Sequence, residues 1–193
     1  MAKRPEDVST GMGNETFRQE YRYIPPQEVA QALERFGYGP EKRFVDALYI
    51  RGNEKEGIGV LEVTEAHCKD HFVGDPILRG VDQIEAAAQT LLLLGVFTTG
   101  IPEGYGPLFS SLGQTEFKNP VVPGSVLNIH VEQEESQSNN VFWGKARIVS
   151  GEAEIVRIDE LYGAIMPIAL RDRLLARSVR SQQRTPSRFQ VLK

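Results

Sequence analysis

The feature that most constrains the fold of this chain is one apolar helical segment, residues 81–97, in the middle of a sequence that otherwise favours strands. The segment is apolar around most of its circumference, and a helix of that kind is buried rather than laid on a surface. Several polar residues interrupt it, which makes it too polar for a membrane span of about 20 residues. We therefore expect one buried helix with the rest of the chain folded around it.

Strand-like segments lie before this helix. Residues 43–50 and 57–64 are rich in β-branched, aromatic and aliphatic side chains, and the polar turn 51–56 separates them. This pattern predicts an antiparallel hairpin. A short amphipathic helix over residues 27–36 precedes the hairpin, and Gly37 stands where a glycine commonly closes a helix.

The second half of the chain is again rich in strands. Residues 127–131 alternate apolar with polar, which is the period of a half-buried strand. Residues 141–149 and 154–166 continue in β-prone residues, and 137–140 form a polar turn. One buried helix with an antiparallel sheet around it is an α+β arrangement.

Composition and charge exclude several classes of protein. The 193 residues fit one domain, and the single cysteine, Cys68, excludes an intramolecular disulfide framework. A net charge of −4 gives no argument for nucleic-acid binding. The polar start of the chain has no signal-peptide pattern, so we expect a cytoplasmic protein. We divide the chain into a flexible arm (1–22), a folded domain (23–169) and a basic tail (170–193).

A histidine and a carboxylate flank the start of the buried helix. Gly74 and Pro76 favour a tight loop after His71, Gly80 begins the helix, and Glu85 lies about one and a half turns into it. A neutral histidine can act as a base, a buried carboxylic acid as a proton donor, and a helix N-terminus can stabilise an oxyanion. The alternative is a loop histidine and a solvent-exposed glutamate with no chemical role.

The sequence offers no cofactor or metal motif. His67, Cys68 and His71 lie close together, but a structural zinc site needs four ligands, and His130 is the only other histidine. No phosphate-binding glycine loop and no nucleophile elbow is present. We expect neither a metal nor a cofactor.

Residues 71–89 resemble the bacterial 3-hydroxyacyl-(acyl carrier protein) dehydratases of the FabZ and FabA types, which have the hot-dog fold. The FabZ pattern is H-F-P-G-x-P-I-x-P-G-V-x-x-x-E-A-x-A-Q. The matching residues are His71, Phe72, Gly74, Pro76, Ile77, Gly80, Val81, Glu85, Ala86, Ala88 and Gln89. The Gly74–Pro76 stretch also matches the FabA loop H-F-x-G-D-P, whereas FabA has Asp at the position of Glu85. A second block, residues 117–124, resembles the FabZ block F-x-x-P-V-x-P-G.

The resemblance implies the catalytic roles. His71 would be the base, with its ring held by the carbonyl of Ile77, and Glu85 would be the acid. Gln89 would orient Glu85, and the N–H of Gly80 would polarise the thioester carbonyl. The active unit would be a homodimer with shared sites, with a trimer of dimers as the alternative assembly, and no cofactor would be needed.

The resemblance also implies substrate contacts. Phe72 and Leu78 would line the acyl tunnel beside Ile77. Arg79 departs from the family, since both types usually have Pro there, and its charge can contact a phosphate or carboxylate of the substrate.

The basic tail and one lysine are candidates for docking the acidic acyl carrier protein. They are Lys118, Arg171 and Arg173. The alternative for the tail is a solvated helix over residues 168–179 without a partner. Two alternatives to a dehydratase stay open: a hot-dog acyl thioesterase and a non-catalytic subunit that binds acyl chains. Chain length and the choice between carrier protein and coenzyme A are not determined by these residues.

Overall fold

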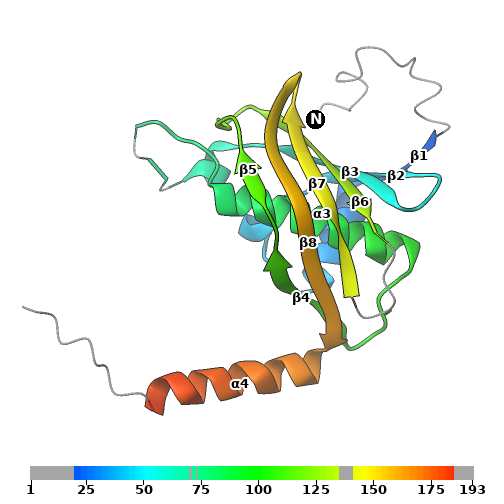
Figure 1. Cartoon of the computed structure of the whole chain (residues 1–193), viewed down its shortest axis with the longest axis vertical. Helices are drawn as coiled ribbons and strands as arrows, with labels where there is room; N and C mark the ends of the chain where they lie inside the picture. The colour runs from blue at the N-terminus through cyan, green and yellow to red at the C-terminus, as the bar shows by residue number, and fades with distance from the viewer. Residues whose placement is uncertain (1–19, 70, 73, 135–140, 185–193) are drawn as a thin grey trace, which may run out of the picture.

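The structure, a computed structural model, describes residues 20–69, 71–72, 74–134 and 141–184 (Figure 1). Their strands form one antiparallel sheet in the order β1-β2-β3-β6-β7-β8-β4, and β5 also pairs with β8. The strands are β1 Tyr21–Ile24, β2 Ala47–Arg51, β3 Glu56–Glu62, β4 Tyr105–Leu112, β5 Thr115–Phe117, β6 Val126–Gln133, β7 Val141–Ser150 and β8 Ala153–Pro167.

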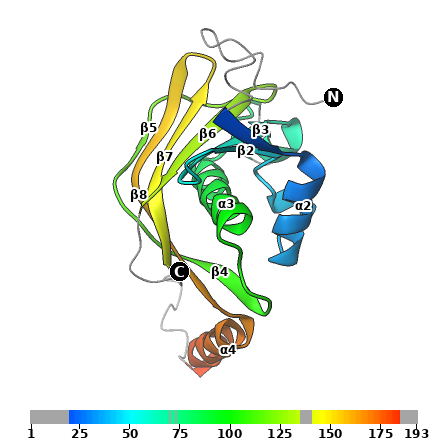
Figure 2. The same ribbon diagram turned by 90° about the vertical axis from the view of Figure 1, so that its right-hand side faces the viewer.

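Helix α3, Gly80–Thr98, lies in the concave side of this curved sheet (Figure 2). Its four consecutive leucines, residues 91–94, are all buried, and Leu91, Leu93 and Leu94 join the main core with the inward side chains of the strands. Apolar burial of this extent is the main favourable term in folding. The antiparallel sheet around one long helix confirms the expected α+β, hot-dog arrangement.

Helix α3 packs closely against strand β3 where Thr90 contacts Gly59. A methyl group at Gly59 of β3 would lie 2.4 Å from Oγ1 of Thr90. Thr90 is fully buried, and its hydroxyl donates to the carbonyl of Ala86. Only glycine at position 59 therefore lets this face of α3 pack directly against β3.

Helix α2, Pro26–Arg35, packs against α3 and β2 (Figure 2). Its apolar face buries Val29 and Leu33. Gly37 has a φ of +88°, and its N–H donates to the carbonyl of Glu34, which ends the helix as expected. Short 3-10 turns follow at η2, Pro40–Lys42, and at η3, Glu65–Cys68.

The strands and hairpin expected from the sequence are present, but one of them is shorter than expected and two further strands, β4 and β5, occur. Residues 43–46 are not in a strand but form the loop that enters β2. We did not expect strands at β4 and β5; β4 is an edge strand that contains Pro107 and is mostly exposed, so it lacks the alternating pattern. The expected turn at 137–140 lies outside the described residues.

The structure differs from the expected limits of the N-terminal arm and of the C-terminal tail. Tyr21 and Arg22, which we placed in the flexible arm, pair with β2 as part of β1, so the arm assignment is wrong for these residues. Residues 1–19 lie outside the described part. The expected tail begins within helix α4, Ile168–Arg184, which stands away from the sheet at the end of β8 (Figures 1 and 2). Residues 185–193 lie outside the described part.

Among the described residues, no helix combines the length and apolar character needed to cross a membrane.

Candidate active site

The ring of His71 is held by the loop that precedes α3. Its Nδ1 lies 3.0 Å from the carbonyl oxygen of Ile77. A carbonyl oxygen can only accept, so Nδ1 carries the hydrogen and the neutral ring has its lone pair on Nε2. This is the contact that the family resemblance implied for Ile77. It leaves a ring nitrogen that can accept a proton.

Two described residues of the loop before Gly80, Phe72 and Gly74, have a positive φ. Phe72 has a φ of +51°, a backbone conformation that residues other than glycine rarely adopt. Its ring lies tilted against the ring of His71, with centroids 4.3 Å apart and an interplanar angle of 46°. The N–H of Asp75 donates to the Phe72 carbonyl at 3.0 Å. Strain of this kind is held in place by surrounding contacts and gathers at functional sites.

The two sequence blocks that resemble FabZ, residues 71–89 and 117–124, meet at the start of α3. The N–H of Leu78 donates to the carbonyl of Val121 at 2.8 Å. A methyl group at Gly80 would lie 2.9 Å from the ring of Phe117. Gly80 is therefore the small residue on which Phe117 packs, as well as the first residue of α3, whose opening N–H groups have no acceptor within the helix.

Arg79 and Asp82 form an ion pair across the first turn of α3. Nε of Arg79 lies 2.6 Å from Oδ2 of Asp82, and Nη2 lies 2.8 Å from Oδ1. Asp82 is buried, whereas the Arg79 side chain is 42% exposed. Two of the nitrogens that we expected to be available for substrate are thus engaged by Asp82.

Gln89 joins Glu85 to the loop before β2. Its Nε2 donates to Oε1 of Glu85 at 3.0 Å and to the carbonyl of Lys42 at 2.7 Å. Its Oε1 accepts from the N–H of Phe44 at 2.8 Å. The side chain is fully buried, and these three bonds use both of its N–H groups. Gln89 thus contacts Glu85 as expected, and it also anchors a loop that the sequence did not connect to it.

Tyr38 is a site residue that the sequence reasoning missed. Tyr38 and Glu85 line one open groove of about 450 Å³ with Gly37, Lys42, Phe44 and Val81. Burial, together with the negative charge of Glu85, raises the pKa of the Tyr38 hydroxyl above its ordinary value. The available signal was weak: a lone aromatic between two glycines just after a helix.

The two residues expected to line the acyl tunnel, Phe72 and Leu78, differ in solvent exposure. Phe72 is 61% exposed, but Leu78 is buried in the main core, so in this structure it packs rather than lining an open wall. Within the described residues, no hydrogen bond or ion pair joins His71 to Glu85 in the same chain.

The expected docking cations differ in how they are paired. Nζ of Lys118 lies 2.6 Å from Glu154 and 3.6 Å from Glu116. Hydrogen bonds from Arg157 and Lys118 lower the pKa of Glu154 to about 2. Arg171 lies beside Asp172, and Arg173 is exposed on α4.

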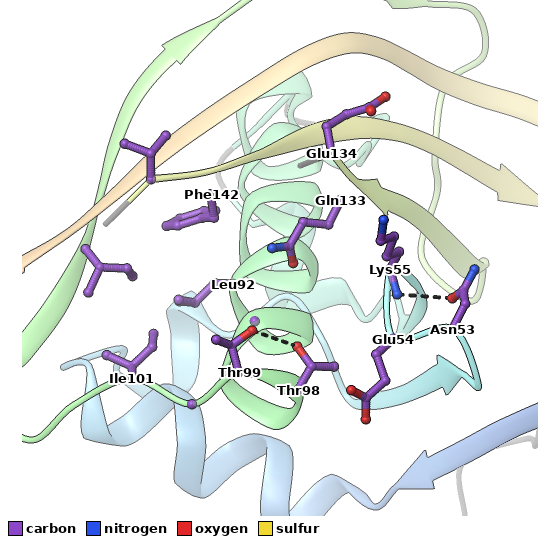
Figure 3. Close-up of a pocket in the computed structure, with 14 residues that line it drawn as sticks. Asn53, Glu54, Lys55, Leu92, Thr98, Thr99, Ile101, Gln133, Glu134 and Phe142 are labelled. Carbon is purple, nitrogen blue, oxygen red and sulfur yellow. Dashed lines mark hydrogen bonds between the residues drawn. The ribbon is translucent and has the colours of Figure 1, made fainter. Parts of the chain in front are cut away.

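A second cavity is remote from these residues. It measures about 470 Å³ and lies at the C-terminal end of α3 (Figure 3). Leu92, Phe142 and Ile165 give it an apolar side, and Gln133 and Thr99 line its polar side. Over the described part of the chain, no group of three or more His, Cys, Asp or Glu side chains is arranged to hold a metal ion.

Known proteins resemble this chain in sequence and in fold. A family model described as ApeI-like, ApeI dehydratase, matches residues 52–152. A 3-hydroxyacyl-[acyl-carrier-protein] dehydratase FabZ from Gluconacetobacter diazotrophicus is 40% identical over 108 residues, which cover 55% of this chain but only 66% of that relative. The FabZ of Rhodospirillum rubrum is 30% identical over 151 residues, covering 77% of this chain and 92% of that relative.

The structural comparison supports the fold alone. A thioesterase superfamily member from Thermus thermophilus superposes with a TM-score of 0.55 and 13% sequence identity. The match covers 67% of this chain and 94% of the other.

Proposed function

Because this chain belongs to the FabZ-type, ApeI-like dehydratase family, we propose that it removes water from 3-hydroxyacyl thioesters to give trans-2-enoyl thioesters. We propose that the acyl group is carried on acyl carrier protein, in fatty-acid synthesis or a related acyl pathway. The observation that carries the proposal is the bond between His71 Nδ1 and the Ile77 carbonyl, because it presents Nε2 as a base.

The reaction balances with the residues in place. His71 Nε2 takes the proton from C2, and the electrons of that C–H bond form the C2=C3 double bond. The C3–O bond breaks as the oxygen receives a proton from Glu85, and water leaves. The N–H of Gly80 at the start of α3 stabilises the negative charge that develops on the thioester oxygen. Phe72 lies beside His71, where it can contact the acyl chain.

We further propose that two copies of the chain form the active unit. The family resemblance supports this proposal, since it implies a site that takes His71 from one copy and Glu85 from the other. Edge strand β4 exposes Leu108 and Phe109, and Val81 is 65% exposed at the start of α3. Exposed apolar side chains on an unpaired strand edge favour pairing with another copy.

Helix α4 supports the carrier-protein proposal. It stands away from the sheet, and Arg173 and Arg177 are exposed on it at a spacing that places them on one face. A basic face raises the rate of encounter with an acidic partner. Lys118 contributes less to this proposal, because Glu154 compensates its charge.

The test is hydration of a crotonyl thioester, on acyl carrier protein and on coenzyme A, followed by loss of enoyl absorbance. His71→Ala and Glu85→Gln should each lower the rate by about 10²-fold or more while circular dichroism stays unchanged. Glu103→Gln, a change at an exposed loop carboxylate, is the matched control and should keep wild-type activity.

The other outcomes of this assay would favour a different function for this chain or refute the roles of the two residues. Release of free thiol would indicate a thioesterase, the alternative function. Binding of acyl chains without turnover would indicate a non-catalytic acyl-binding subunit. Near-normal turnover in either site variant would refute the assigned roles.

A further inference from the structure

We infer that Gln83 is a positioning residue for the proposed reaction. Its side chain and its backbone N–H together fix the turn that carries both the carbonyl holding His71 and the N–H of Gly80. This inference rests on the proposed function. Gln83 lies in the first turn of α3 and is 4% exposed, so its side chain contacts the protein and not the solvent.

Three successive peptide units join the carbonyl that holds His71 to the first residue of α3. In the Ile77–Leu78 unit, the carbonyl accepts from Nδ1 of His71 at 3.0 Å. The Leu78–Arg79 unit follows, and then the Arg79–Gly80 unit, which contains the N–H of Gly80. Because each peptide unit is planar, a hydrogen bond that fixes its carbonyl also fixes the direction of its N–H.

Gln83 binds the second and the third of these units. Its Nε2 donates to the carbonyl of Leu78 at 3.0 Å, and its backbone N–H donates to the carbonyl of Arg79 at 3.1 Å. The N–H of Asp82 also donates to the Arg79 carbonyl, at 3.0 Å. Since that carbonyl points into the helix, the N–H of Gly80 in the same planar unit points away from it. This is the direction from which the N-terminus of a helix binds an anion.

Only one end of the Gln83 amide is used. Within the described part of the chain, its Oε1 is buried without a hydrogen-bond partner. A buried acceptor without a partner is costly, and an apolar side chain of similar size would avoid that cost. What glutamine supplies at this position, and an apolar residue does not, is therefore the donor that holds the Leu78 carbonyl.

Other contacts hold the same segment to the rest of the fold. The N–H of Leu78 donates to the carbonyl of Val121 at 2.8 Å, and the Leu78 side chain is buried in the main core. Removal of the Gln83 amide should therefore loosen the turn and leave the fold intact. A donor held in place stabilises a developing charge without having to reorient, so a looser turn should slow the chemical step.

Gln83→Met tests this inference because it removes the amide and keeps a flexible side chain of similar size. With the 3-hydroxyacyl thioester as substrate, kcat should fall about tenfold, comparable to the loss of one buried hydrogen bond. KM should change by less than about twofold, because the negative charge on the thioester oxygen develops only in the transition state. Gln83→Leu also lacks the donor and should show the same fall in kcat at a similar KM.

Amide hydrogen exchange gives a second measurement that needs no turnover. In Gln83→Met, the N–H of Leu78 should exchange about tenfold faster or more than in the wild type, whereas that of Ile129, buried on β6, should keep its rate. A merely structural role would speed both amides together. In the wild type the Leu78 amide should be protected, and exchange at the rate of an unprotected amide would overturn the inference.

Gln133→Met is the matched control. Gln133 lies on β6 and lines the cavity remote from the site, and its Oε1 is also buried without a partner among the residues that the structure describes. This variant should keep the wild-type kcat and the wild-type exchange rate of the Leu78 amide. An unchanged kcat in Gln83→Met or Gln83→Leu would refute the positioning role, as would a change confined to KM.

The wild-type and Glu85→Gln arms separate this inference from the proposed function. Wild-type turnover that Glu85→Gln abolishes supports the function whatever Gln83→Met does. Lack of turnover in the wild type refutes the proposed function and, with it, the inference. Wild-type turnover with an unchanged kcat in Gln83→Met refutes the inference alone.

Discussion

Arg79 clamps the buried carboxylate of Asp82 with two hydrogen bonds, at 2.6 and 2.8 Å, across the first turn of α3. The backbone of Arg79, with φ −61° and ψ 143°, is one that proline adopts without strain. The arginine found where related dehydratases usually have proline is therefore not required by the backbone. Its role in the structure is the ion pair with Asp82, three residues later.

Arg79→Pro should therefore lower the free energy of unfolding by about 2 kcal/mol, because it leaves the buried Asp82 carboxylate without its cation. This value lies between those of exposed and buried ion pairs, since Arg79 is partly exposed. The double variant Arg79→Pro/Asp82→Leu should recover most of the loss, because it removes the buried charge as well. Urea unfolding of the wild type, both single variants and the double variant measures the coupling. Additive effects of the two changes would contradict the clamp.

Gln89→Leu should cost about 2–4 kcal/mol of stability and most of the activity. The substitution leaves the Phe44 N–H and the Lys42 carbonyl without their partner and removes one donor from Glu85. Gln114→Leu is the matched control, because Gln114 is exposed and bonds only to Glu116, at 3.2 Å, through its side chain. Equal unfolding midpoints for the two variants would refute the anchoring role.

His130 should make stability depend on pH. It lies on β6 between Ile58 and Arg147 of the neighbouring strands. Burial and, to a smaller extent, Arg147 lower the pKa of His130 below the ordinary 6.5. His130 lines an open cavity of about 410 Å³, whose charged lining residues are Glu56, Glu132, Lys145, Arg147, Arg157 and Asp159.

The sign follows from proton binding. Below pH 6.5 the unfolded chain binds a proton at His130 that the folded chain resists, so the contribution of neutral His130 is complete above pH 6.5 and is lost as the pH falls through its lowered folded-state pKa. His130→Gln should therefore flatten the rise of unfolding free energy with pH in the range below pH 6.5. Identical slopes for wild type and variant, measured by urea unfolding across this range, would count against the burial effect.

Reversing a charge on α4 should raise KM for thioesters of acyl carrier protein but not for thioesters of coenzyme A. Arg173→Glu should raise KM for a substrate on acyl carrier protein by roughly threefold to tenfold at low salt, and added salt should reduce the difference. The coenzyme A thioester should be used as before, because it lacks the acidic protein surface. Arg147→Glu, a change at an exposed arginine of β7, is the matched control. Equal losses on both carriers would mean that α4 does not dock the carrier.

The sequence by itself determined the elements whose signal is local. The apolar run of α3, the β2–β3 hairpin and the strands β6 to β8 carry periodicities that short-range sterics and burial impose on neighbouring residues. The residues His71, Gly80, Glu85 and Gln89 were visible because a helix start and its preceding loop lie within one stretch of chain.

Tertiary structure alone decided the features that join distant segments. Edge strand β4 and the pairing of β1 with β2 depend on partners across the sheet, not on their own weak patterns. Packing of Phe117 against Gly80 and the groove that Tyr38 shares with Glu85 link segments 37 and 47 positions apart. Such contacts form only once the core has brought the segments together, so no local pattern encodes them.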